Sequence, residues 1–78
     1  MTVIPDYRGF RIEVEAVVTG MRWNATVRIL RLFSQDTPHV DVVTCLKLMP
    51  ELAEHAGEIW AKQWVDLQMN DGSNAGAP

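Results

Sequence analysis

The chain has 78 residues, an apolar content of 47% and a formal net charge of −3 at neutral pH. This length allows one domain with a single core, and the apolar content excludes an intrinsically disordered chain. The lone cysteine, Cys45, excludes an internal disulfide and favours a reducing, cytoplasmic setting. No apolar run approaches the roughly 20 residues that span a bilayer, and the first ten residues lack a signal-peptide pattern.

The first predicted strand follows a short lead-in, residues 1–6, which we expect to end at Pro5 and Asp6. From Tyr7 onwards apolar and polar residues alternate, which is typical of a half-buried strand. Gly20 supplies the following turn, because glycine accepts positive φ without steric cost. This strand and the next therefore form a predicted β-hairpin. The apolar face of the first strand would carry Phe10, Ile12, Val14, Ala16 and Val18.

The second predicted strand, residues 21–33, lies in the middle of the sheet. Its apolar face would carry Trp23, Ala25, Val27 and Ile29, which alternate with polar residues. The alternation slips after Ile29, where Leu30 and Leu32 fall on the polar face. Either a bulge near residues 29–31 restores the phase, or both faces of the sheet are partly covered at this end.

A polar loop at residues 34–38 precedes the third predicted strand, residues 40–48. Apolar residues occur at both odd and even positions here, so the alternation defines the buried face less sharply than in the first two strands. The expected inward set is Val40, Val42, Thr44 and Leu46, and the expected outward set is Asp41, Val43, Cys45 and Lys47.

A helix is predicted over residues 50–69, because Pro50 suits the first helical position and the apolar period changes there. Gly57 lies inside this helix and would permit a close approach to the sheet. The expected domain is residues 1–69, and residues 70–78 would form a flexible tail. The expected inner face carries Leu52, Ala53, Ala56, Ile59, Trp60, Trp64 and Leu67, with Gln63 among them. The opposite face carries Glu51, Glu54, His55, Glu58, Lys62 and Asp66.

The order of the elements predicts an α+β fold of β-β-β-α type. Three antiparallel strands would form a meander, and the amphipathic helix would pack on its apolar face. The other face of the sheet would stay open. With so small a core, the stability margin of the domain should be thin.

The first predicted hairpin carries a sequence pattern found elsewhere. Tyr7, Gly9 and Ile12 open it as Tyr-x-Gly-x-x-Ile, and Trp23 and Ala25 follow as Trp-x-Ala. This pattern resembles small uncharacterised proteobacterial proteins of unknown function, over about a third of the chain. The resemblance implies a small β-rich domain and no catalytic residues. A looser likeness is to the double-stranded-RNA-binding fold, but the lysine-rich helix start of that fold is missing, so RNA binding is not inferred.

Few residues suggest chemistry. Glu51, His55 and Glu58 stand at a spacing that could hold a metal, but such a set is more often a solvated helix face. Cys45 lies two residues from Lys47, and no partner in the sequence makes it a nucleophile. The sequence therefore predicts no enzyme activity, no metal and no cofactor.

The leading hypothesis is a non-enzymatic module that binds another protein or itself. Residues 40–46 are rich in β-branched side chains, carry one charge and contain no proline, so this edge strand is expected to self-associate. The alternative hypothesis is a nucleic-acid-binding domain that uses the open sheet face, although the net charge is negative. No membrane partner is expected. The candidate surface for the two hypotheses comprises Arg11, Arg22, Asn24, Arg28, Val43, Cys45 and Lys47.

Overall fold

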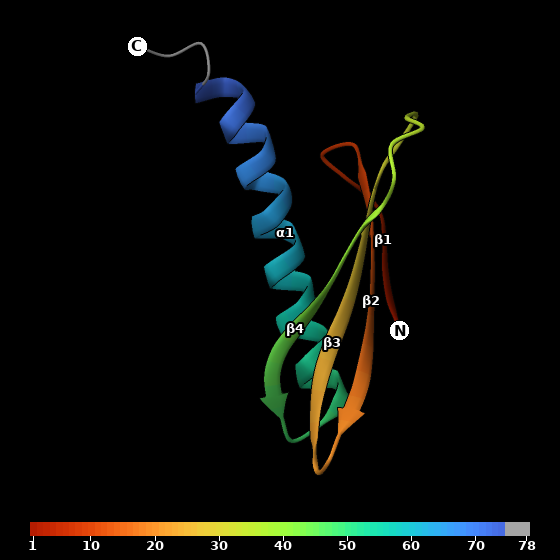
Figure 1. Ribbon diagram of the computed structural model, residues 1–78, viewed down its shortest axis with the longest axis vertical. Helices are drawn as coiled ribbons and strands as arrows, with labels where there is room; N and C mark the ends of the chain where they lie inside the picture. The colour runs from red at the N-terminus through yellow and green to blue at the C-terminus, as the bar shows by residue number, and fades with distance from the viewer. Residues whose placement is uncertain (75–78) are drawn as a thin grey trace.

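The computed structural model describes residues 1–74, with the side chains of residues 1–70. Four strands form one antiparallel sheet in the order β1-β2-β3-β4, and one helix packs across a single face of it (Figure 1). The expected α+β fold, an antiparallel sheet followed by a helix, is confirmed, but the expected three-stranded meander is wrong. The elements are β1 (Thr2–Tyr7), β2 (Phe10–Thr19), β3 (Arg22–Arg31), β4 (His39–Lys47) and α1 (Pro50–Asn74).

The additional strand is β1, which forms where a lead-in without secondary structure was expected. It pairs antiparallel with β2, and its register shifts between Ile4 and Tyr7, where Pro5 lies. Proline lacks an N–H for the ladder, so it is tolerated in an edge strand beside such an irregularity. The edge of β2 is therefore covered, and β1 and β4 are the two edges of the sheet.

The β2–β3 hairpin pairs without interruption from Phe10 opposite Arg31 to Thr19 opposite Arg22. This continuous register excludes the bulge considered near residues 29–31. Leu30 lies opposite Arg11 on the outer face and is half-buried, so both faces are partly covered at this end. The apolar residues that the two strands bury are Phe10, Ile12, Val14, Ala25, Val27 and Ile29, all on the predicted apolar faces.

The helix packs on the sheet through small side chains rather than large ones. Ala53, Gly57, Ala61 and Val65 recur every four residues and are buried. Relative to the expected inner face, α1 is turned by about a third of a turn. Small residues let the helix axis approach the sheet closely, whereas the bulky Trp60 and Trp64 fit only at its margin. The predicted helix phase was therefore wrong: Leu52, Ile59 and Leu67 are exposed.

The predicted phase of β4 was also wrong. His39, Asp41 and Val43 pair with Ile29, Val27 and Ala25, which are core residues of β3, so they share the face covered by α1. The expected inward residues Val40, Val42, Thr44 and Leu46 are exposed instead. The sequence misled because valine occurs at both parities of this strand, so that hydrophobicity alone does not set its phase.

A bulge in β4 is held by one buried side chain, Asn24. Between the pairs Ala25–Val43 and Trp23–Lys47, β4 carries two residues more than β3. The Oδ1 atom of Asn24 accepts the N–H groups of Cys45 and Leu46 at 3.1 and 3.0 Å, and Leu46 has a φ of 48°. The amide thus replaces the ladder hydrogen bonds that the bulge removes.

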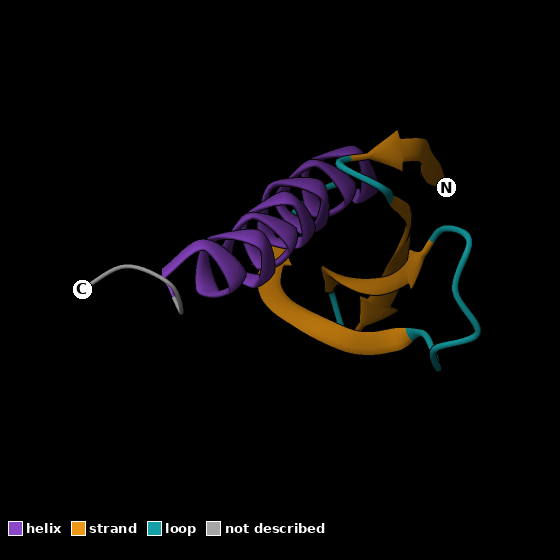
Figure 2. Cartoon of the chain, turned by 90° about the horizontal axis from the view of Figure 1, so that it is seen from above, coloured by secondary structure: helices purple, strands orange, loops and turns teal. Residues whose placement is uncertain are grey.

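The molecule is long and thin, with principal extents of 47 × 27 × 17 Å. Figure 2 shows the strands curving around one side of α1, which leaves the rest of the helix surface free of the sheet. The helix continues to Asn74, beyond its predicted end at residue 69. The rest of the expected tail, residues 75–78, lies outside the described residues.

Candidate interaction surface

The β1 side of α1 is closed by polar contacts. Thr2 Oγ1 donates to Glu54 Oε1 at 2.7 Å, and Tyr7 Oη donates to Asp66 Oδ1 at 3.0 Å. Arg8 Nη1 lies 2.8 Å from the same Asp66 oxygen. The hydrogen bond from Arg8 lowers the pKa of Asp66, and that from Thr2 lowers the pKa of Glu54. These two carboxylates of the helix are therefore partnered within the chain.

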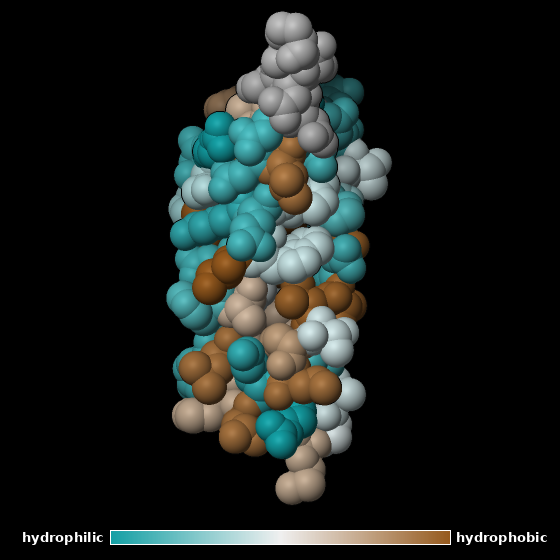
Figure 3. All heavy atoms as spheres, turned by 90° about the vertical axis from the view of Figure 1, so that its left-hand side faces the viewer, coloured by the Kyte–Doolittle hydropathy of each residue, from teal (hydrophilic) through white to brown (hydrophobic). Residues whose placement is uncertain are grey.

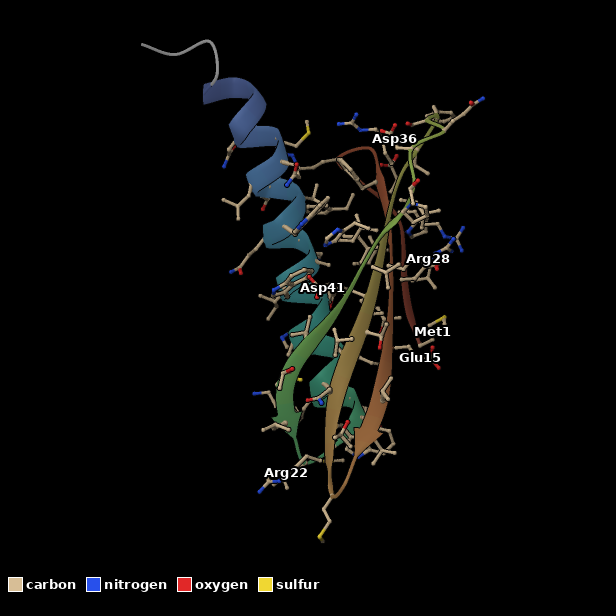
Figure 4. All side chains as sticks on the ribbon, in the orientation of Figure 1. Met1, Glu15, Arg22, Arg28, Asp36 and Asp41 are labelled. Atoms are coloured by element: carbon tan, nitrogen blue, oxygen red, sulfur yellow. The ribbon has the colours of Figure 1, made fainter. Side chains whose placement is uncertain are left out.

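The β4 side of α1 is built from aromatic rings. His39 stacks on Trp64 with ring centroids 4.5 Å apart, and the ring of Trp60 lies 6.3 Å from His39. Asp41 lies between β4 and α1 (Figure 4), with its Oδ2 atom 3.6 Å from His39 Nε2. These half-buried side chains close the seam between β4 and the helix.

Outside this aromatic layer lies a row of exposed apolar side chains. Leu52, Ile59 and Leu67 occupy one side of α1 and are 50%, 45% and 60% exposed. Exposed apolar residues continue through the β4–α1 turn, and Figure 3 shows several groups of apolar atoms on this face of the molecule, most of them in its lower half, with polar atoms between them. We call this surface the β4–α1 flank. It comprises Leu46, Leu48, Met49, Leu52, Ile59 and Leu67.

The outer edge of β4 borders the flank. Within residues 1–74, β4 pairs only with β3, so its other edge is open. Two features protect this edge. The Oδ1 atom of Asp41 accepts the N–H of Val42 at 2.8 Å, and the bulge interrupts the strand before Leu46. The regular part of the open edge is therefore short, from residue 39 to residue 43.

The seven residues nominated from the sequence do not lie on one face. Arg11 and Arg28 point outward, and both contact Glu13, at 3.0 and 3.2 Å. Asn24 is buried and engaged with the bulge. Val43 and Cys45 are half-buried, with Val43 packed against the core, whereas Arg22 and Lys47 are exposed near the β2–β3 turn. The flank was not predicted from the sequence, although the regular spacing of Leu52, Ile59 and Leu67 is present there.

The remaining candidate groups have partners of their own. In the described part of the chain, no three His, Cys, Asp or Glu side chains are placed to hold a metal. The Sγ atom of Cys45 donates to the carbonyl of Trp23 at 3.5 Å. A hollow of about 260 Å³ lies at the end of the sheet beside Trp64, but its Arg31 is 3.6 Å from Asp36 and covers the ring of Phe10.

No family model, curated protein or solved structure matches this chain. The resemblance to small proteobacterial proteins therefore stays a prediction. Within the described residues, no helix is both long and apolar enough to cross a membrane. The geometry defines the class: a small α+β domain that leaves one apolar side of its helix uncovered.

Proposed function

We propose that this chain is a small, non-enzymatic protein-interaction module that binds its partner through the β4–α1 flank. One observation carries the proposal: Leu52, Ile59 and Leu67 follow one another along the side of α1 that the sheet does not cover, each about half exposed. Single exposed apolar residues are ordinary, but several of them on one surface are typical of a binding site.

Two other surfaces of the domain are occupied by polar contacts within the chain, and this contrast supports the flank as the binding surface. The β1 side of the helix uses Glu54 and Asp66 in hydrogen bonds within the chain. On the outer sheet face, Glu13 already accepts from Arg11 and Arg28. Binding at these places would have to break existing polar contacts, whereas binding at the flank removes apolar surface from water.

Self-association through the open edge of β4, residues 40–46, stays a separate candidate for how two copies of the chain could meet, because that edge borders the flank. Nucleic-acid binding by the outer sheet face stays the alternative hypothesis. Unpaired arginine side chains on that face would support this hypothesis, but Arg11 and Arg28 both pair with the carboxylate of Glu13. A gel-shift assay at low salt tests this alternative, since phosphate contacts are strongest there.

A comparison of two lysine substitutions tests the proposal. Ile59→Lys places a charge in the flank, and Val17→Lys places one on the outer face of β2 at a similar exposure, 45% against 43%. Immobilised parent and Val17→Lys chains should retain the same proteins from native extract. Ile59→Lys should retain about tenfold less, which corresponds to roughly 1.4 kcal/mol. Equal retention by all three chains would contradict the proposal.

A further inference from the structure

We infer that the occupant of the β4–α1 flank is a second copy of this chain, with the two α1 helices packed antiparallel about a two-fold axis. The inference rests on the proposed function, because it names the partner of the same flank. It differs from pairing of the strand edges, since side chains of the helix make the central contact.

The chain exposes more surface than a compact monomer of its mass. The chain exposes 5303 Å², whereas a compact monomer of 8.8 kDa exposes about 4,800 Å². Its radius of gyration is 13.7 Å, against about 11.5 Å for a compact domain of this length. An interface of standard size removes about 800 Å² from each partner. A dimer contact of that size would remove more than the excess surface of the single chain.

The flank is also self-complementary, as a two-fold contact requires. Ile59 follows Leu52 by seven positions, and Leu67 follows Ile59 by eight positions. A two-fold axis beside Ile59 therefore sets Leu52 of one copy opposite Leu67 of the other, and the reverse contact follows by symmetry. The nearly equal spacing makes both ends of the contact apolar.

The residues between these leucines fit the same arrangement. The exposed Gln63 would lie opposite Ala56 of the second copy, where a small side chain leaves room for the amide. Ile59 would lie opposite Trp60 of the second copy, so the half-buried indole would lose contact with water. Two copies would thus bury two Ile59–Trp60 contacts at the axis and two polar–small contacts beside them.

The charges of the chain favour helix contact over strand contact. A two-fold pairing that uses the regular edge of β4, residues 39–43, is centred on Asp41 and sets two carboxylates opposite each other. It must also displace Asp41 from the N–H of Val42. On α1, by contrast, Glu54 and Asp66 face β1 and are hydrogen-bonded there, away from the axis.

Sedimentation at tens of micromolar tests the second copy. The parent and Val17→Lys chains should have twice the mass of 8.8 kDa, and Ile59→Lys should have the single mass. Leu52→Lys, at a position that is also half exposed, should reproduce the effect if Ile59→Lys lowers the melting temperature. A monomeric parent would overturn the inference, as would a dimer that both flank substitutions leave intact.

Cysteine cross-linking tests the antiparallel arrangement. In a Cys45→Ser chain, Leu52→Cys and Leu67→Cys variants should form a disulfide dimer when mixed under mild oxidation, and neither should do so alone. Efficient cross-linking of Leu52→Cys with itself would overturn the arrangement, because it requires parallel helices.

The two proposals can fail separately. If the parent is monomeric and retains another protein that Ile59→Lys does not retain, the dimer inference is wrong and the proposed interaction module remains supported. A monomeric parent whose retained proteins are the same with Ile59→Lys overturns both.

Discussion

Gly57 of α1 lies directly against Ala25 of β3. A β-carbon on Gly57 would be only 2.7 Å from the Cβ atom of Ala25 and 2.7 Å from Cγ1 of Val14. The close approach that the sequence predicted at this glycine is therefore confirmed. The contact sets the distance between helix and sheet, and through it decides which side chains of α1 remain outside the core.

Gly57→Ala should destabilise the domain, although alanine is the better helix former by about 1 kcal/mol. The added methyl has no room beside Ala25, and such overpacking costs about 1–3 kcal/mol. Urea unfolding measures the change. Gln68→Ala, at an exposed position of the same helix, is the control and should change stability by less than about 0.5 kcal/mol. A more stable Gly57→Ala chain would show that the helix shifts freely on the sheet.

Val65→Ala and Leu67→Ala should have unequal effects on folding. Val65 is fully buried, so losing its two methyl groups should cost about 1–3 kcal/mol. Leu67 is 60% exposed, and its truncation should cost less than about 0.5 kcal/mol in dilute monomeric protein. Thermal melts at sub-micromolar concentration separate this folding effect from association. A larger loss of stability for Leu67→Ala than for Val65→Ala would support the helix phase expected from the sequence.

Asn24→Ala should destabilise the β4 bulge. It removes the acceptor of the N–H groups of Cys45 and Leu46, and a buried unsatisfied group costs about 1–3 kcal/mol. Hydrogen exchange at these two amides should accelerate more than exchange in the β2–β3 hairpin. Thr19→Ala removes only the partner of the Asn24 amide nitrogen and should have a smaller effect. Unchanged exchange at both amides would mean that water replaces the side chain.

The stability of the domain should fall as the pH falls through the range of its carboxyl groups. The pKa of Asp66 is lowered from 3.8 by the hydrogen bond from Arg8, and the pKa of Glu54 is lowered from 4.5 by that from Thr2. A lowered folded-state pKa stabilises the protein above the unfolded pKa, and this contribution is lost as the carboxylate becomes protonated.

Urea midpoints at pH 7 and pH 3 measure this dependence. The midpoint of the parent chain should drop between the two values, and the midpoint of Asp66→Asn should drop less. Asp36→Asn is the control, since its carboxylate is exposed and lies 3.6 Å from Arg31. A parallel drop in the parent and Asp66→Asn chains would contradict the assigned role of Asp66.

The sequence alone predicted a large part of this fold because its signals there are local. Alternation in β2 and β3 follows from the geometry of a strand with one buried face, and the glycine after Thr19 is sufficient for the turn. The change of period at Pro50 likewise gave the start of the helix correctly. Strand β1 was not predicted because it contains a proline, which indicates a break in a strand unless the neighbouring strand is known.

Only the tertiary structure decided how α1 and β4 are oriented and what they leave uncovered. Hydrophobicity favoured the large side chains of the helix as its inner face, but packing density selected Ala53, Gly57, Ala61 and Val65. Likewise, Asn24 and the pairing with β3 set the phase of β4, where valines stand on both faces. The sequence determined which segments become strands and helix, because that depends on neighbours in the chain. The exposed flank depends on the fit between segments that are distant in the chain, so it became visible only in the folded molecule.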